Sequence, residues 1–302
     1  MSWKILQFQY SQIIEKIREK KNFSSDWKKF QVLSNEINKN PPLAISTLQQ
    51  SVEQIAKIKP KNKIRIFDHG CGAGLKIIYL ACIGYKNIYG VNVNFDVYPI
   101  NKILKSKFKL SEQRFFQTEG KKVPFKSNFF DFIISCQVLE HLREDEIYHY
   151  YSEEGRVLKK NGLVYHEVPH KLIPYESHTR LWLIHLFPNF LKPLLYGIFI
   201  SVQKKKNLFF KGRYYAERYT KNFLILRMPN FHKKMLKRYI GNFKDLTQDR
   251  LSSQSDLSSY DRDSPIRLRK LIQKIFTIPL LGKLVIIIFK NFFILQTLAK
   301  KK

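Results

Sequence analysis

The sequence predicts an α/β protein with a parallel central sheet, a helical N-terminal extension and a C-terminal insertion or lid. Three observations predict it. A glycine loop lies between a short alternating strand and an apolar helix, and further short apolar segments follow at intervals long enough for a helix. Residues 1–59 carry apolar side chains at helical spacing. Residues 171–280 depart from both patterns and form the expected insertion.

The N-terminal extension, residues 1–59, should be mostly helical. Its first helical segment breaks at Asn40-Pro41-Pro42, and a second one covers residues 44–58 and ends before Pro60. The core, residues 60–170, then alternates strands with helices. Its expected elements are a strand at 63–67, the glycine loop at 68–74, a helix at about 75–83, and strands at 88–93, 129–135 and 163–168.

The string HEVPH at residues 166–170 matches the zinc motif H-E-x-x-H. A zinc site needs both histidines one helical turn apart on the same face of a helix. Pro169 has no N–H and pushes Val168 toward extended dihedrals, so a helix is not expected. We predict instead a strand that ends at Pro169, with His166 and Glu167 on opposite faces and His170 at the start of a loop. No metal site is predicted.

The insertion, residues 171–280, should act as a substrate lid, with a flexible Ser-rich loop near 251–263. Its apolar stretch at 191–202 is followed by lysines 204–206, a composition that suits an anionic membrane surface. A core helix with a solvated lysine cap is the competing interpretation. Residues 281–302 should return to the sheet as a last strand at 292–298 with a basic tail. Lysines interrupt this apolar end, so no membrane span is expected.

Composition limits the class of protein. The 302 residues are 44% hydrophobic and 14% aromatic, which is enough for a sizeable core and excludes a disordered chain. Three irregularly spaced cysteines do not form a disulfide framework or a CxxC metal site, so we expect reduced thiols in a cytoplasm. No export signal is evident at the N-terminus.

The net charge is the strongest compositional signal, with 54 Lys and Arg against 24 Asp and Glu, a formal +30. Such a charge attracts polyanions such as nucleic acid or an anionic membrane. A bias toward lysine-rich composition, with much of the lysine on solvated surface, explains the charge equally well. Charge therefore leaves the partner open.

The glycine loop reads G-x-G-x-G and follows Asp68 at the end of a strand. Glycines there let a ligand approach the backbone and the positive N-terminus of the next helix. The dinucleotide fingerprint G-x-G-x-x-G would need a glycine where Leu75 stands. An acid before the loop suits a ligand with a cationic amino-acid end better than a pyrophosphate.

Read in order, the motifs resemble those of the class I S-adenosylmethionine-dependent methyltransferases. The series covers about residues 63–170 and consists of FDHGCGAG, GVNVN, TEGKKVPF, SNFFDFIIS and QVLEHL. It is similar to the branch that methylates small molecules, lipids and sugars. The resemblance implies a Rossmann-like sheet, S-adenosyl-L-methionine as cofactor and methyl transfer as the reaction.

The resemblance also assigns residues to the cofactor. The methionine part would be held by Asp68, Gly70, Cys71, Gly72 and Gly74. Asn92 stands where the family has an acid on both ribose hydroxyls, and an amide can accept one hydrogen bond and donate another. Glu119 would contact the adenine amino group, with Gly120 and Lys121 along the ring, and Gln137 and His141 would lie beside the methyl group.

Methyl transfer from a sulfonium is a direct displacement, so the protein mainly aligns the acceptor, which can contribute roughly 7 to 11 kcal/mol. A hydroxyl acceptor also needs a general base, for which the candidates are His141, His170 and His178. The predicted acceptor is a small molecule, a glycan or a lipid-linked compound, methylated at oxygen in the cytoplasm or at the inner membrane face. The alternatives are a nucleic-acid methyltransferase, against which no RNA-binding module is recognisable, and a non-catalytic protein of the same fold, suggested by Asn92.

Overall fold

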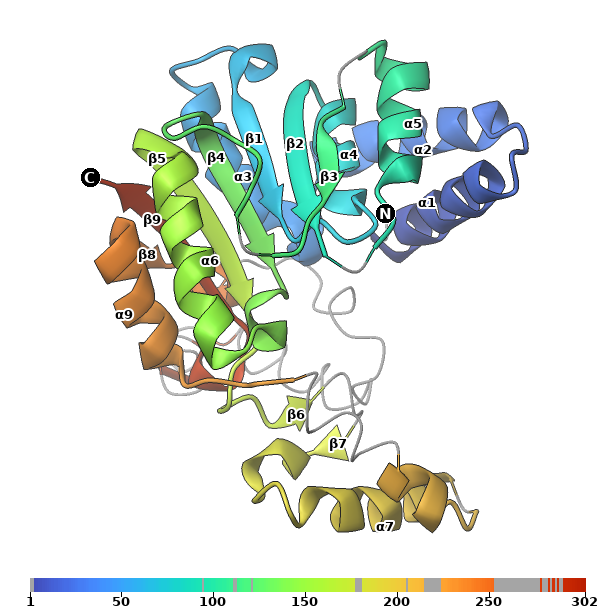
Figure 1. Ribbon diagram of the computed structural model, residues 1–302, viewed down its shortest axis with the longest axis vertical. Coiled ribbons are helices and arrows are strands. Elements are labelled where there is room, and N and C mark those ends of the chain that lie inside the picture. Colours follow the sequence, from blue (N-terminus) through green and yellow to red (C-terminus); the bar gives the residue numbers. More distant parts are fainter. Residues whose placement is uncertain are drawn as a thin grey trace.

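A seven-stranded sheet forms the centre of the protein, in the strand order β3-β2-β1-β4-β5-β9-β8 (Figure 1). The first five strands of this order are parallel, β9 is antiparallel to β5, and β8 is antiparallel to β9. The strands are β1 (Arg65–His69), β2 (Asn87–Asn92), β3 (Phe115–Gln117), β4 (Phe130–Cys136), β5 (Leu158–Val168), β8 (Gly241–Asp245) and β9 (Leu295–Lys301). The carboxyl ends of the parallel strands therefore meet at one edge of the sheet.

This computed structural model describes residues 3–93, 95–110, 113–120, 122–176, 181–204, 206–214, 224–252 and 290–302, with a few isolated positions between 278 and 287. The predicted flexible loop at 251–263 lies outside these residues apart from its first two positions.

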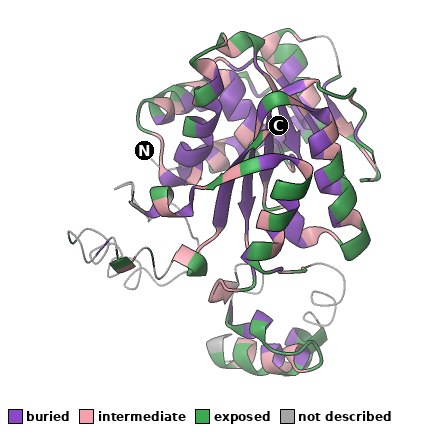
Figure 2. Cartoon of the chain, turned by 90° about the vertical axis from the view of Figure 1, so that its left-hand side faces the viewer, coloured by how far each residue is buried: buried purple, intermediate pink, exposed green. Residues whose placement is uncertain are grey.

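Two layers of helices cover the sheet. One face carries α1 (Trp3–Arg18), α2 (Ser24–Lys39), α3 (Leu43–Ala56), α4 (Leu75–Cys82) and α5 (Tyr98–Phe108), whose apolar residues form one core cluster with side chains of β1, β2 and β4. The other face carries α6 (Glu144–Val157) and α9 (Pro229–Tyr239), which form a second cluster with β4, β5 and β9. Figure 2 shows the strands as the most continuously buried part of the chain, as expected of a sheet covered on both faces.

A smaller unit lies beyond the carboxyl edge of the sheet (Figure 1). It contains the hairpin of β6 (Tyr175–Glu176) and β7 (Leu181–Trp182), the short 3₁₀ helix η3 (Ile184–Leu186) and α7 (Lys192–Lys204). Its small core consists of Leu181, Ile184 and Tyr196, with Leu195 and Ile200 packed against it. The unit thus has too little core to bury its other apolar residues.

The strands and helices expected for residues 1–170 are present with ends shifted by up to about five residues, except that residues 1–39 form two helices, α1 and α2, where a single helical segment was expected. Three helices precede the sheet, and each expected strand of residues 60–170 is present. The HEVPH string lies in β5 and the following turn, and its His166 and Glu167 contact partners on opposite faces: Glu154 of α6 for His166, and Lys76 of α4 for Glu167. The motif match is therefore an accident of a strand followed by Pro169.

The C-terminal part differs from expectation in two ways. The chain returns to the sheet at α9 and β8, well before residue 281, and the expected basic tail is part of β9. Edge strand β8, with the sequence GNFKD, has only one large apolar side chain, so its pattern gives no strand signal. Lys301 pairs with Gly241 of β8, and its Nζ also donates to the carbonyl oxygens of Gly155 and Leu158, each at 2.6 Å.

Candidate functional site

The glycine loop follows β1 at the carboxyl edge of the sheet. The backbone N–H groups of Gly70 and Cys71 both donate to Val91 O of β2 at 3.0 Å, which bends the chain away from the strand. Gly70 has φ +88°, and a Cβ there would lie 2.5 Å from Val138 Cγ2. Only glycine fits this position, because both the backbone conformation and the space exclude a side chain.

Gly72, at the tip of the loop, is different. Its φ is +51°, but a Cβ there would meet no atom within 4 Å. The loop is also anchored to the N-terminal extension, since the Tyr10 hydroxyl of α1 donates a hydrogen bond to Ala73 O at 2.7 Å. A rigid loop with open space over its tip can accept a ligand against its backbone.

Asp68 lies at the end of β1, directly before this loop, and only 5% of its surface is exposed. Burial raises the pKa of its carboxyl from 3.8 to about 7, although the nearby Lys76 ammonium acts in the opposite direction. A buried carboxylate without a full counter-charge favours a cationic ligand group beside it. The α-ammonium of an amino acid is such a group.

Asn92 ends β2, next to β1. Its Nδ2 is buried and makes no hydrogen bond to any described residue. A buried amide donor without a partner is costly, and a ligand hydroxyl could satisfy it. Beyond β3, Glu119 is exposed and Gly120 adopts φ +81°; Lys121 lies outside the described residues. The residues assigned to ribose and adenine thus follow β2 and β3, in the order that one extended ligand along this edge requires.

A polar cluster lies beside Asp68, between α4, β4, β5 and β9. Its centre is Glu167, which is 3% exposed. One oxygen, Oε1, lies 3.6 Å from Lys76 Nζ and accepts from Gln137 Nε2 at 3.3 Å, and the other accepts from Gln296 Nε2 at 2.9 Å. The sequence analysis predicted only the face of the strand on which Glu167 lies, gave it no role in the site, and did not single out Lys76 or Gln296. The available signal was that Glu167 and Gln137 both follow core strands at their carboxyl ends.

The three candidate bases have different surroundings. His141, in the 3₁₀ turn η2 (Leu139–His141), has a side chain 32% exposed, with Nε2 3.8 Å from Glu140 Oε1. His170 is buried and donates from Nε2 to Phe293 O at 2.8 Å, while its Nδ1 accepts from the Leu172 amide at 3.3 Å. Burial lowers the pKa of His170 to about 4, so it is neutral and fully bonded. His178 lies outside the described residues.

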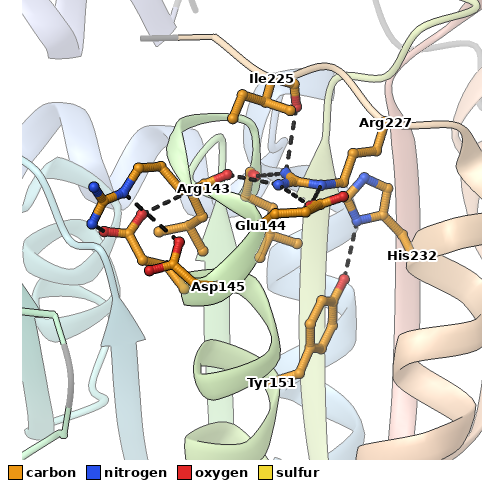
Figure 3. Close-up of polar contacts among 10 residues, drawn as sticks. Arg143, Glu144, Asp145, Tyr151, Ile225, Arg227 and His232 are labelled. Atoms are coloured by element: carbon orange, nitrogen blue, oxygen red, sulfur yellow. Dashed lines mark hydrogen bonds and ion pairs between the residues drawn. The ribbon is translucent and has the colours of Figure 1, made fainter. Parts of the chain in front are cut away.

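Arg227 joins the segment that returns from the insertion to the turn after β4 (Figure 3). Its guanidinium donates to Leu139 O at 3.0 Å, to Leu142 O at 2.8 Å and to Glu144 Oε2 at 2.8 Å. Ile225 adds a backbone bond to Glu140 O at 2.6 Å. These bonds fix the turn that carries Gln137 and His141, which no pattern in the sequence predicts because the partners are about 85 residues apart.

Residues 67–166 match the family model described as a methyltransferase domain. These residues run from the middle of β1, through the glycine loop, to β5, and so contain most of the edge described above. The chain carries a class I methyltransferase domain. This domain spans about a third of the 302 residues, and it confirms the fold class predicted from the motifs, with methyl transfer as the activity of the domain and S-adenosylmethionine as its cofactor. No curated protein sequence matches the methyltransferase.

Several solved structures are distantly similar to the methyltransferase. The YcgJ protein from Bacillus subtilis is 12% identical, with a TM-score of 0.42, over 84% of this chain and 99% of that chain. The geranyl diphosphate C-methyltransferase from Streptomyces coelicolor A3(2) is 11% identical, with a TM-score of 0.41, over 80% and 71%. The PH0226 protein from Pyrococcus horikoshii OT3 is 23% identical, with a TM-score of 0.32, over 40% of this chain and 57%, less than two thirds, of that chain. At these scores the likeness carries no information on the acceptor.

Proposed function

We propose that this methyltransferase methylates an oxygen of a small-molecule, glycan or lipid-linked acceptor, and that a lipid-linked acceptor fits it best. The observation that carries the lipid-linked choice is the exposed apolar surface of residues 181–204 and 206–214, called the apolar unit below. Its most exposed large side chains are Phe190 at 79%, Phe210 at 78%, Val202 at 72% and Tyr214 at 69%. Exposed apolar residues gathered in one small unit mark a binding surface for protein or membrane.

The charge of the apolar unit supports contact with an anionic surface. Lys206 and Lys211 are exposed close to Phe210 in the sequence, and Lys192 begins α7. Apolar side chains that enter the boundary of a bilayer, flanked by lysines at its anionic headgroups, are typical of interfacial helices. Among the described residues, no helix is both long and apolar enough to cross a membrane. The proposal is therefore attachment at the surface.

The cofactor residues follow from the geometry of the carboxyl edge. S-adenosylmethionine supplies the electrophilic methyl group. In this proposal its methionine end lies over Gly72 beside the Asp68 carboxylate, its ribose satisfies the Asn92 amide, and its adenine lies near Glu119 and Gly120. In the same proposal, Gln137 and the Glu167 cluster would lie nearest to the reacting end.

Of the candidate bases, His141 is the one we propose for the acceptor proton. Its imidazole is partly exposed, and its Nε2 lies 3.8 Å from Glu140 Oε1, a carboxylate that can orient the ring. His170 is less suited, because both of its nitrogens are already bonded.

The experiment measures transfer of a radiolabelled methyl group from S-adenosylmethionine to a chloroform-extracted lipid fraction and to a water-soluble glycan fraction of cells that express the protein. We expect label in the lipid fraction, and a loss of roughly tenfold or more in Phe190→Ser/Phe210→Ser. Phe8→Ser is the matched control, since Phe8 is 65% exposed on α1, far along the chain from the apolar unit. Label confined to the glycan fraction, or an equal loss in the control, would contradict the lipid-linked choice.

A further inference from the structure

A hollow lined by cations lies at the amino-terminal edge of the sheet, the edge opposite to β6, β7 and α7 in Figure 1. Its volume is about 500 Å³, and its charged lining residues are Lys59, Lys63, Arg65, Arg114 and Lys159. We call it the basic hollow. The methyltransferase activity described above makes no use of it.

The basic hollow is separate from the cofactor site. Arg65 is the first residue of β1 and His69 is the last. At a rise of about 3.3 Å per residue, the strand separates these two backbone positions by about 13 Å. A small ligand at the basic hollow therefore cannot also reach the glycine loop that follows His69.

One carboxylate holds two of the lysines in place. Asp131 accepts from Lys59 Nζ at 2.7 Å and from Lys159 Nζ at 2.7 Å, and its Oδ2 also accepts from the Arg65 amide at 2.8 Å. Burial opposes the charged form of Asp131, but these hydrogen bonds outweigh it and lower its pKa. The carboxylate is therefore ionised at neutral pH and fixes both ammonium groups beside the hollow.

The two arginines are held by aromatic rings. The Arg65 guanidinium lies 4.4 Å from the centre of the Phe129 ring, and that of Arg114 lies 5.1 Å from the centre of the Tyr89 ring. Arg114 is 8% exposed and also donates to Lys86 O at 3.1 Å. Planar guanidinium groups fixed in this way present N–H donors in the arrangement that phosphate oxygens match best.

The charges of the basic hollow are not balanced by Asp131. Leaving Arg114 aside, the four other lining cations have one ion-paired carboxylate, Asp131, among the residues that the structure describes, which leaves a formal excess of three positive charges. Like charges held close together repel one another, and a bound anion removes this cost. The sequence shows the same concentration, since KIKPKNKIR at residues 57–65 contains five basic residues and no acid.

We propose that the basic hollow binds the linked phosphate groups of a small polyphosphate, such as the triphosphate of a nucleotide. Several fixed cations around a concavity match several negative charges within one short group. Its volume lies within the range of about 300 to 1,000 Å³ for small-molecule sites. A nucleic-acid strand would instead need cations spread as a stripe along the surface. The hollow is a second ligand site on this enzyme, at the edge remote from methyl transfer.

Titration calorimetry of the full chain with inorganic triphosphate, at about 150 mM salt, tests the proposal. We expect saturable binding that weakens at least tenfold in Lys63→Gln/Arg65→Gln. The matched control is Lys234→Gln/Lys237→Gln, which removes the same charge from exposed positions of α9 and should change the affinity less than twofold. Unchanged S-adenosylmethionine binding in both variants shows that each is folded.

Three results would overturn the proposal. The first is that the wild-type chain fails to bind triphosphate. The second is an equal loss of affinity in both double variants, which would indicate non-specific attraction by the net charge. The third is a single-stranded RNA that displaces triphosphate at a lower phosphate concentration, with a salt dependence that spans many phosphates, which would indicate an extended nucleic-acid surface instead.

Discussion

The carboxyl and amino edges of the sheet carry opposite charges, and the charged groups differ in their burial and in their partners. At the carboxyl edge, the acids Asp68 and Glu167 are buried, and Lys76 lies near both. At the amino edge, cations surround an open hollow, and two of them, Lys59 and Lys159, bind the carboxylate of Asp131. The pKa of Asp68 is raised and that of Asp131 is lowered. The comparison teaches that the partners of a buried carboxyl group indicate which ligand its edge can bind. Asp68 has too little positive charge beside it and suits a cationic ligand, whereas the cations around Asp131 exceed its one negative charge and suit an anionic ligand.

The largest effect should come from Asp68→Asn, which removes a buried charge without changing shape. The folded-state pKa of Asp68 is raised to about 7, so its carboxyl does not lower the free energy of unfolding below about pH 4. The destabilisation grows as the pH rises from about 4 to about 7 and is complete above that. At about 1.4 kcal/mol for each pKa unit, the variant should be more stable than the native protein by up to about 4 kcal/mol above pH 7. Urea unfolding at pH 4, 6 and 8 measures this.

The same variant should bind S-adenosylmethionine more weakly, because the cofactor ammonium loses its counter-charge. Equal unfolding free energies of the variant and the native protein at pH 8 would show that the buried Asp68 carboxylate does not destabilise the protein without a ligand.

A paired substitution in the glycine loop sharpens the account of the carboxyl edge. Gly70→Ala places a methyl group against Val138 as well as in a left-handed conformation, so we expect a loss of about 3 kcal/mol in unfolding free energy. Gly72→Ala meets open space and should cost only about 1 kcal/mol, but should lower cofactor affinity by more than tenfold. Thermal unfolding measures the effect on stability, and titration calorimetry measures the effect on cofactor affinity. Unchanged cofactor affinity in Gly72→Ala would show that the cofactor does not lie over the tip of the loop.

The smallest effect is expected from Asp131→Asn at the amino edge. Its pKa is lowered in the folded state, so its stabilisation is present above about pH 4 and disappears as the pH falls below that. The three groups it binds are partly exposed, so we expect a loss of about 1 kcal/mol at pH 7 and none at pH 3. The pH trend is thus opposite in sign to that of Asp68→Asn, and parallel trends in urea unfolding would refute the contrast between the edges.

The sequence predicted the parallel half of the fold well because its signals are local. Alternating apolar residues, the Asp68 loop and the helix that follows lie within about 20 residues of one another, and the motif order places the cofactor at one edge. The prediction that HEVPH does not form a helix was equally local, because it depended on Pro169 within the motif. The last strand was predicted at 292–298 and is present as β9, whereas α9 and β8 were missed because the pairing of β8 depends on β9, far away in the sequence.

The site was predicted only where single residues follow strands. The contacts of Glu167 with Lys76 and Gln296, and those of Arg227 with the turn after β4, join segments that are distant in the sequence. No spacing rule connects such partners, because the topology of the sheet brings them together. In the sequence, the basic hollow shows only as net charge and as the basic run at residues 57–65, and the same +30 fits solvated lysines equally well.

The position of β9 has a consequence for how the chain is made. It is the last strand in the sequence, yet it lies between β5 and β8, so about 126 residues separate Val168 of β5 from Leu295 of β9. At roughly 5 to 20 residues per second, the ribosome needs about 6 to 25 s to add them. During that interval β5 presents an unpaired edge to the crowded cell, which invites pairing with other chains. Nascent chains halted before Leu295 should therefore depend on a chaperone to stay soluble.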